Sequence, residues 1–489
     1  MTLTRRHFCG LAGCGSLVLG LGGCAVNPAT GKQDLLLTSD SDERQLGMQE
    51  HPKILQQFGG VYEDPAAGGY VAAIGGRLAA VSETPSLGFT FTLLNSPIVN
   101  AFAVPGGYVY ISRGLMLLAE DEAELAGVLG HEIGHVVARH SAQRRSRAML
   151  AQLGAGLLGA VVGGEASQLA GSVAGLYLQS YSRDQELEAD MLGIRYLRRA
   201  GYDANGMTSF LEKMRANSQL EARISGRSPN DVDAYDITAT HPRTIARVRQ
   251  AASLAGNGQG RSEVRRRNPY LDTIDGMIFG DGPEQGFVRG QRFVHPVLRF
   301  EFSVPAGFSL SNTPQQVVAI DKKREAKIVF DQAPKPFQGT MTSYIGRSWA
   351  AGARVSGLEA IEINGLSAAT GVVNGRMGNT PAVLRLLAIR FDARRVFRFI
   401  FIAPVPAMRQ LATELQRTTY SFRRITPAAA ATVRPKRLRV VQAGASVKAD
   451  DFASRMSVDK LPRERFLVLN GLSENGSLDG RARVKIVAG

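Results

Sequence analysis

The chain has 489 residues and a formal net charge of +15, and its only cysteines are Cys9, Cys14 and Cys24. Because all three lie near the start, the body of the chain must fold without disulfides, and its length suffices for about two or three hydrophobic cores. So high a charge would favour nucleic-acid binding in an intracellular protein, but anionic lipid, lipopolysaccharide or cell wall in an exported one. A solvated surface without a specific partner explains the charge equally well.

Residues 1–23 are predicted to be an export signal, because a basic start and an apolar stretch lead to small residues. The sequence TRRHF resembles the twin-arginine signal, whose route carries folded proteins. Two stretches look like a lipoprotein box. Cleavage before Cys14 would leave a very short apolar region, so Cys24 is the predicted lipidated residue. Ala25 follows it in place of the Asp that holds many lipoproteins at the inner membrane, which favours the outer membrane.

The polar, turn-rich segment 26–34 is then expected to be a short tether. The alternatives are a soluble secreted protein that is cut nearby and a retained anchor helix.

A strand is predicted at Phe102–Ser112, ahead of a predicted helix. An extended peptide could pair with such a strand through its backbone, which gives affinity with little side-chain selectivity. Asn100, Ala101 and Phe102 are therefore the predicted contacts for a polypeptide substrate.

The stretch 127–145, GVLGHEIGHVVARHSAQRR, is predicted to contain a metal-binding helix. His131 and His135 are four residues apart, so they share a helix face and can reach one zinc ion at about 2.0–2.1 Å. Glu132 lies beside the open position of such a zinc, where it can take a proton from water. His140 would lie about 140° away around the helix and is interpreted as a solvated or capping histidine. The alternative is a chance match, in which buried His and Glu would be costly.

Residues 148–178 are rich in Gly and Ala and carry a single charge, at Glu165. The apolar pieces on either side are shorter than the ~20 residues of a spanning helix. Two closely packed helices are expected, and a lid or a membrane-dipping hairpin is the alternative.

A second amphipathic helix is predicted within 181–197, with three acids at Glu186, Glu188 and Asp190. Glu186 and Asp190 share a face, whereas Glu188 points off it. One carboxylate could bind zinc while the other orients a ligating histidine. An acidic face that makes salt bridges is the alternative.

The order HEIGH and then, about fifty residues later, SRDQELEAD resembles the gluzincin family of the HtpX heat-shock protease, the CAAX-prenyl protease and the periplasmic protease BepA. The resemblance covers residues 35–250. It implies that Glu186 is the third zinc ligand and Asp190 a supporting residue. Upstream, residues 100–116 resemble the strand and turn that precede the metal helix in this family.

The sequence THP at 240–242 matches a motif of the soluble periplasmic members of this family. His241 could be a fourth ligand that substrate displaces, or a group that stabilises the oxyanion. A surface His-Pro turn is the third interpretation.

The rest of the chain divides by composition. Residues 24–250 form the predicted protease domain and 251–290 a linker, in which NPYLDTIDGMIFG could pack back on that domain. Residues 291–425 are predicted to be an antiparallel α+β domain without a catalytic constellation. Residues 426–436 form a second linker. Residues 437–487 resemble a LysM module, although Gly-Ala-Ser at 444–446 replaces Gly-Asp-Thr, and a small βααβ packing module is the alternative.

The expected fold is therefore α+β: a mostly helical zincin domain with a small edge sheet, then the antiparallel domain and the βααβ module. The expected function is a zinc endopeptidase, with one Zn²⁺ per chain, that removes misfolded or misassembled envelope proteins. It would be exported, lipid-anchored in the periplasm and without nucleic-acid partners, with peptidoglycan or anionic lipid as further ligands. The alternative is a non-catalytic chaperone or assembly lipoprotein with a structural zinc, a kind of site usually closed by four ligands.

Overall fold

The computed structural model describes residues 23–31, 33–149, 181–230, 241, 245–256, 264–444, 447–478 and 480–489. Residues 1–22 of the predicted signal and nearly all of segment 148–178 lie outside these residues. The chain forms two compact units, Met1–Met277 with Arg437–Ala488 (unit 1) and Ile278–Lys436 (unit 2). Its helices and sheets confirm the α+β class.

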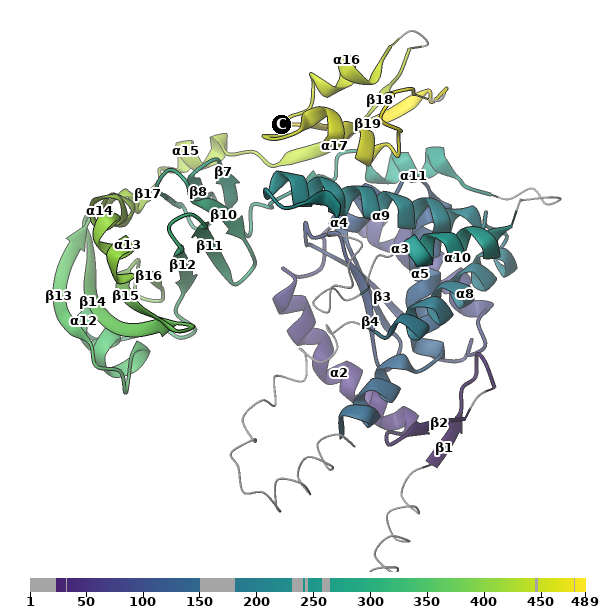
Figure 1. Ribbon diagram of the computed structural model, residues 1–489, viewed down its shortest axis with the longest axis horizontal. Coiled ribbons are helices and arrows are strands. Elements are labelled where there is room, and N and C mark those ends of the chain that lie inside the picture. Colours follow the sequence, from purple (N-terminus) through teal and green to yellow (C-terminus); the bar gives the residue numbers. More distant parts are fainter. Residues whose placement is uncertain are drawn as a thin grey trace, which may run out of the picture. The chain divides into compact units, whose positions relative to one another are not determined.

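Unit 1 is built around helix α5 (Glu122–Val137), which lies among the other helices of the unit in Figure 1. Every residue of α5 except Val136 is buried. The neighbouring helices, in chain order, are α3 (Pro65–Ala80), α4 (Arg113–Leu118), α8 (Arg183–Arg199), α9 (Asn205–Ile224) and α10 (Ile245–Ala255). α3, α8 and α9 contact α5 directly, and α10 packs on α8 and α9. Because α5 is so fully enclosed, each of its polar side chains needs a partner inside the protein.

Local sequence explains where α5 begins and how closely α8 approaches it. The side chain of Asp121 accepts a hydrogen bond from the backbone N–H of Glu124, which caps the helix. A Cβ atom added to Gly130 would lie 3.2 Å from Cα of Gly193 on α8, and one added to Gly193 would lie 2.9 Å from the backbone nitrogen of His131. These two glycines therefore allow the backbones of α5 and α8 to meet at the level of His131.

A small sheet lies beside these helices, with the strand order β3 (Thr90–Leu94), β5 (Tyr108–Ser112), β4 (Ala101–Val104). β3 runs parallel to β5 and β4 antiparallel to it. β4 is thus an edge strand, and it contacts α5.

The segment predicted to be a tether is structured instead. β1 (Gly23–Val26) pairs antiparallel with β2 (Gln33–Leu36) to form the N-terminal hairpin, and α2 (Asp40–Gln57) follows. The backbone N–H of Leu37 donates to Oγ of Ser146, and the guanidinium of Arg139 donates to the carbonyl of Thr38. These bonds hold the residues directly after the hairpin to the body of unit 1, and such distant partners could not be predicted from the local pattern.

The C-terminal module has the predicted strand–helix–helix–strand order. Its elements are β18 (Lys436–Gln442), α16 (Ala449–Ala453), α17 (Pro462–Leu469) and β19 (Arg483–Ala488), with the two strands antiparallel. The module is part of unit 1, and one buried cation fixes it there: Nζ of Lys485 donates to the carbonyls of Leu117, Leu118 and Ala119 and lies 3.3 Å from the Glu120 carboxylate. Burial lowers the pKa of Lys485 to about 8, although Glu120 opposes the shift.

We expect Lys485→Met to destabilise unit 1 by about 3–5 kcal/mol, because the change removes one buried cation from beside the Glu120 carboxylate and leaves three carbonyls without their donor. Thermal or urea unfolding measures the loss. Lys460→Met is the matched control, since Lys460 is exposed and its hydrogen bond to the carbonyl of Ile224 lies at the surface. Equal stability of the two variants would contradict this role of Lys485.

Unit 2 contains a seven-stranded antiparallel sheet. Its strands, in spatial order, are β10 (Ser309–Asn312), β11 (Gln316–Asp321), β12 (Ala326–Gln332), β16 (Val396–Pro404), β15 (Thr380–Arg390), β14 (Leu366–Met377) and β13 (Ser356–Ile363). A second sheet has the order β17 (Arg423–Arg424), β9 (Phe300–Ser303), β8 (Arg292–His295), β7 (Phe287–Arg289). This agrees with the antiparallel domain expected from the sequence.

The two faces of the large sheet are covered differently. Phe397, Phe399 and Phe401 occupy every second position of β16 and therefore point to the same face of the sheet. They share one hydrophobic core with side chains in and beside α13 (Val405–Gln410) and α14 (Ala412–Ser421). Val396, on the opposite face, packs with α12 (Met341–Ser343) and the π-helical turn η2 (Tyr344–Trp349). Unit 2 therefore has hydrophobic cores of its own.

Two predicted boundaries are wrong. The domain end at 250 falls inside α10, and the predicted linker 251–290 contains α11 (Arg267–Ile274), β6 (Ile278–Phe279) and β7. Tyr270, Leu271 and Ile274 are buried, because their spacing gives α11 an apolar face. The second linker holds the short helix α15 (Pro427–Thr432). Within the described residues, no helix is both long and apolar enough to cross a membrane.

Candidate metal centre

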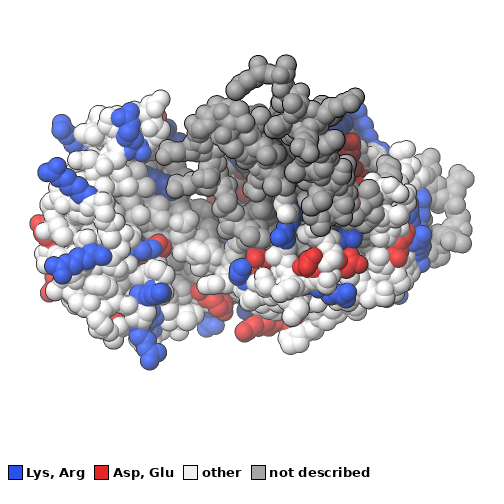
Figure 2. All heavy atoms as spheres, turned by 90° about the horizontal axis from the view of Figure 1, so that it is seen from below, with Lys and Arg blue, Asp and Glu red and all other residues white. Residues whose placement is uncertain are grey.

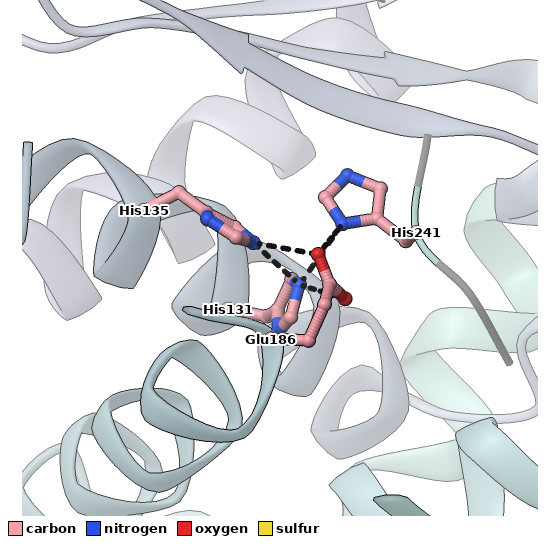
Figure 3. A group of neighbouring side chains, drawn as sticks. All are labelled: His131, His135, Glu186 and His241. Atoms are coloured by element: carbon pink, nitrogen blue, oxygen red, sulfur yellow. Dashed lines mark hydrogen bonds and ion pairs between the residues drawn. The ribbon is translucent and has the colours of Figure 1, made fainter. Parts of the chain in front are cut away.

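Four side chains from three parts of unit 1 converge on one point (Figure 3). His131 and His135 come from α5, Glu186 from the first turn of α8, and His241 from just before α10. One ligand atom from each lies within 4.8 Å of all the others. We call these residues the metal cluster; it unites the three ligands expected from the sequence with His241.

The spacing within the metal cluster suits a tetrahedral ion. Nε2 of His131 lies 3.0 Å from Nε2 of His135 and 3.3 Å from Nδ1 of His241. Oε1 of Glu186 lies 3.4 Å from Nε2 of His135 and 2.9 Å from Nδ1 of His241. Ligands about 2.0–2.1 Å from a zinc ion stand about 3.3–3.4 Å apart. The residues present therefore fit the ion.

Charges within the metal cluster suit a cation as well. Burial lowers the pKa of His135 well below its usual value, which keeps the ring neutral and its lone pair free. Burial alone would raise the pKa of Glu186, but the charges of His241 and Arg247 outweigh it and hold that pKa well below its usual value. The cluster thus offers the neutral imidazole of His135 beside the ionised carboxylate of Glu186.

Glu132 is buried next to the metal cluster and outside it. Its Oε1 lies 3.4 Å from Nε2 of His241. Its Oε2 has no hydrogen-bond partner among the residues that the structure describes. A carboxylate beside the ligands, with one oxygen uncommitted, can hold a water molecule and accept its proton.

Asp190 and Arg247 support the metal cluster from behind. Oδ1 of Asp190 lies 2.8 Å from Nδ1 of His131, the ring nitrogen that faces away from the cluster. The guanidinium of Arg247 donates to both oxygens of Asp190, at 2.7 and 2.8 Å, and lies 2.7 Å from Oε2 of Glu186. Arg247 was missed because its sequence surroundings, IARVR, do not distinguish a buried arginine from a solvated one.

The interpretation of His140 as solvated or capping is wrong. His140 is completely buried, and its Nδ1 lies 2.9 Å from Nδ1 of His135. The predicted rotation assumed that the helix continues, but α5 ends at Val137 and Arg139 has a φ of 55°. This left-handed residue turns the chain back and returns His140 to the side of the metal ligands.

The prediction of one strand at Phe102–Ser112 is wrong: β4 ends at Val104, and a turn at Gly106 and Gly107 leads into β5, because only glycine readily takes the positive φ of 83° found there. Ala101 and Phe102 are buried, and the Phe102 ring packs between Phe58 and Tyr110 at centroid distances of 5.0 and 4.9 Å. Asn100 precedes β4, and its backbone N–H donates to Oγ of Ser112. Only the main chain of the edge strand β4 is thus suited to pair with a peptide.

Comparison with known proteins locates the similarity in this part of the chain. Residues 65–255 match the profile of Peptidase family M48. A putative beta-barrel assembly-enhancing protease of Vibrio cholerae is 37% identical over 207 residues, and the beta-barrel assembly-enhancing protease of Escherichia coli K12 is 36% identical over 205 residues. The alignments cover 40% and 39% of this chain, and 40% and 39% of those relatives.

A more distant relative is the mitochondrial metalloendopeptidase OMA1 of Schizosaccharomyces pombe, which is 31% identical over 199 residues, 40% of this chain and 55% of that protein. The region matched to Peptidase family M48 includes all four residues of the metal cluster. Over this region, the comparisons support the resemblance to metalloproteases.

Proposed function

We propose that this protein is a zinc-dependent endopeptidase that hydrolyses peptide bonds of misfolded or misassembled envelope proteins. The observation that carries the proposal is the uncommitted, buried oxygen of Glu132 beside the metal cluster. Zinc, when bound, would supply the Lewis acidity that makes water nucleophilic near neutral pH. Glu132 would hold the attacking water and take its proton, and Asp190 would keep His131 oriented.

Metal removal tests this proposal. We expect the purified protein to contain one zinc per chain and to cleave unfolded casein. A chelator should abolish cleavage, and added zinc should restore it. Cleavage that does not respond to the chelator would contradict a metal-dependent reaction.

The substrate class is proposed from the edge strand and from the relatives. An extended chain paired with β4 would be held through its backbone beside α5, so little side-chain selectivity is expected. The names of the two bacterial relatives refer to beta-barrel assembly. Both observations favour polypeptides that have failed to fold or assemble in the envelope.

We propose that His241 is a fourth ligand that leaves when substrate enters, because its Nδ1 lies at ligand spacing from both His131 and Glu186. His241→Ala should then retain zinc, since three ligands remain, and should cleave casein at least as fast as the unchanged protein. Zinc content and initial rates measure this. Metal loss as complete as that of a Glu186 variant would favour the alternative, a non-catalytic chaperone with a closed structural zinc.

We further propose that the protein is exported and anchored by acylation at Cys24. The sequence of the first 24 residues supports this proposal. A single fatty acyl chain binds a membrane only marginally, whereas two or more acyl chains anchor a protein stably. Cys24→Ser should release the protein to the soluble periplasmic fraction, or leave its signal uncleaved, and should abolish lipid labelling. Cys14→Ser should change neither. If lipid labelling depended on Cys14 instead, the signal would be cleaved before Cys14 and the proposed cleavage before Cys24 would be wrong.

We also propose that the protein is attracted to anionic lipid, because the excess of basic residues is concentrated in one part of the chain. Unit 2 alone holds 22 Lys and Arg against 10 Asp and Glu, most of the excess in the chain. Figure 2 shows such cations spread over one face of the molecule rather than gathered in a single patch. Diffuse attraction of this kind adds to a lipid anchor and weakens with salt.

The C-terminal module is proposed to be LysM-like, with peptidoglycan as the ligand that this resemblance implies. Its strand–helix–helix–strand order supports the proposal. Sedimentation with purified peptidoglycan tests it.

A further inference from the structure

The two ligating rings on α5 are supported by different partners. Each ring turns Nε2 toward the metal cluster and Nδ1 away from it. Nδ1 of His131 meets the carboxylate of Asp190 at 2.8 Å, whereas Nδ1 of His135 meets another imidazole, that of His140, at 2.9 Å. A ligating histidine needs such a partner, because the bond at the far nitrogen fixes the tautomer and the orientation of the ring.

The hydrogen bond between His135 and His140 determines which ring nitrogen of each histidine carries a proton. If Nε2 of His135 keeps its lone pair for the metal, Nδ1 of His135 carries the hydrogen and donates it to Nδ1 of His140. A neutral His140 then carries its own hydrogen on Nε2. That nitrogen makes no hydrogen bond among the described residues, but it lies 3.6 Å from Oε2 of Glu188, an electrostatic contact longer than a hydrogen bond. Glu188 thus lies behind His140, on the side away from the metal cluster.

The other oxygen of Glu188 reaches the start of the chain. Nδ2 of Asn27 donates to Oε1 of Glu188 at 3.3 Å, and Asn27 is 5% exposed. Its Oδ1 accepts the backbone N–H of Ala29 at 2.9 Å, which fixes the orientation of the amide. Asn27 directly follows β1, so the contact comes from the N-terminal hairpin.

The second strand of the hairpin is bonded to the same region. Nε2 of Gln143 donates to Oδ2 of Asp34 at 2.8 Å and to the carbonyl of Ala138, just beyond α5, at 2.9 Å. Oε1 of Gln143 accepts from Nε2 of Gln185, the residue before the ligand Glu186. Both strands of the hairpin are therefore held against the chain segments that carry metal ligands.

We propose that His140, Glu188 and Asn27 are positioning residues for His135, so that the hairpin containing Cys24 is part of the support of the metal centre. This inference rests on the proposed zinc-peptidase function. Cys24 pairs with Leu35 within the hairpin, and three extended residues span at most about 11 Å. An acyl anchor at Cys24 would therefore hold the metal centre close to the membrane, without a flexible spacer.

The test uses variants of the full-length protein and measures zinc affinity by competition with a chromophoric chelator. His140→Phe fills the space but removes the acceptor, and should weaken zinc binding about 10–100-fold, as loss of a ligand's hydrogen-bond partner typically does. Asn27→Ala should weaken it less. His140→Asn returns an acceptor near the Nδ1 position and should recover part of the loss. Asp184→Asn, exposed on the same helix as Glu188, is the matched control.

Three further measurements separate positioning from simple stabilisation. Casein cleavage by the zinc-saturated variants should lose kcat with little change in KM. Metal-free His140→Phe and His140→Asn should unfold at the same temperature. The effects of His140→Phe and Asn27→Ala on zinc affinity should be less than additive, because residues in one network are coupled; strictly additive effects would overturn the route through Glu188.

Failure of this inference is distinguishable from failure of the proposed function. If the His140→Phe and Asn27→Ala variants bind zinc as tightly as the Asp184→Asn control while Glu186→Ala loses it, the positioning role is wrong and the metal site stands. If the unchanged protein binds no zinc, the proposed function itself fails and the positioning role falls with it.

Discussion

Glu132→Gln is expected to retain zinc and lose proteolysis. Glu132 lies outside the metal cluster, and its closest contact there is the 3.4 Å approach to Nε2 of His241. Glutamine has nearly the same size, but its amide cannot accept the proton of the attacking water. General-base catalysis contributes about 10²–10⁴-fold, so kcat/KM for unfolded casein should fall by about that factor while metal content stays at one zinc per chain.

The control for this change is Glu212→Gln, at an exposed position on α9. It should leave both rate and metal content unchanged. Cleavage by the Glu132 variant at the rate of this control would show that another group serves as the base. Loss of zinc from the Glu132 variant would instead mean that the carboxylate helps to bind the ion.

The parts of the site that could be predicted follow from local helix geometry. The four-residue spacing of His131 and His135 requires only a helix, and α5 supplies it. Glu186 was singled out by the resemblance, since spacing alone left it equivalent to Asp190. What brings these residues together is the close approach of α5 and α8 at Gly130 and Gly193, and no single-helix pattern encodes such an approach.

The parts that could not be predicted depend on where the chain turns. His140 was assigned by extending an ideal helix, but the left-handed residue Arg139 ends that geometry one position earlier. Arg247 and Asn27 act through contacts with residues 57 and 161 positions away, for which the sequence carries no local signal. Within residues 251–290, the expectation that NPYLDTIDGMIFG packs back on the protease domain is confirmed, since Tyr270 is buried and donates to the carbonyl of Met116. The prediction of a linker fails because the Gly and Arg content of the segment conceals the short apolar face of α11.

Glu186→Ala is expected to abolish stoichiometric zinc binding, which is a larger effect than any other change on α8. Its carboxylate is the only anionic member of the metal cluster, and the loss should exceed the about 10–100-fold typical of residues that only support a ligand. Asp190→Ala should fall within that range, because Asp190 is outside the metal cluster and supports it through His131 and Arg247. Metal analysis after dialysis, with chelator competition, ranks the two.

The matched comparison lies on the same helix. Glu188 points away from the metal cluster toward His140 and Asn27, so Glu188→Ala should still bind zinc stoichiometrically. Glu186→Ala also removes a buried ion-pair partner of Arg247. Glu186→Gln, which keeps the side-chain volume, should therefore be measured beside it. Thermal unfolding of the metal-free proteins checks that both variants fold. If folded Glu186→Ala and Glu188→Ala lost zinc equally, the third ligand would not be Glu186. The convergence of α5 and α8 would then serve the fold rather than the metal.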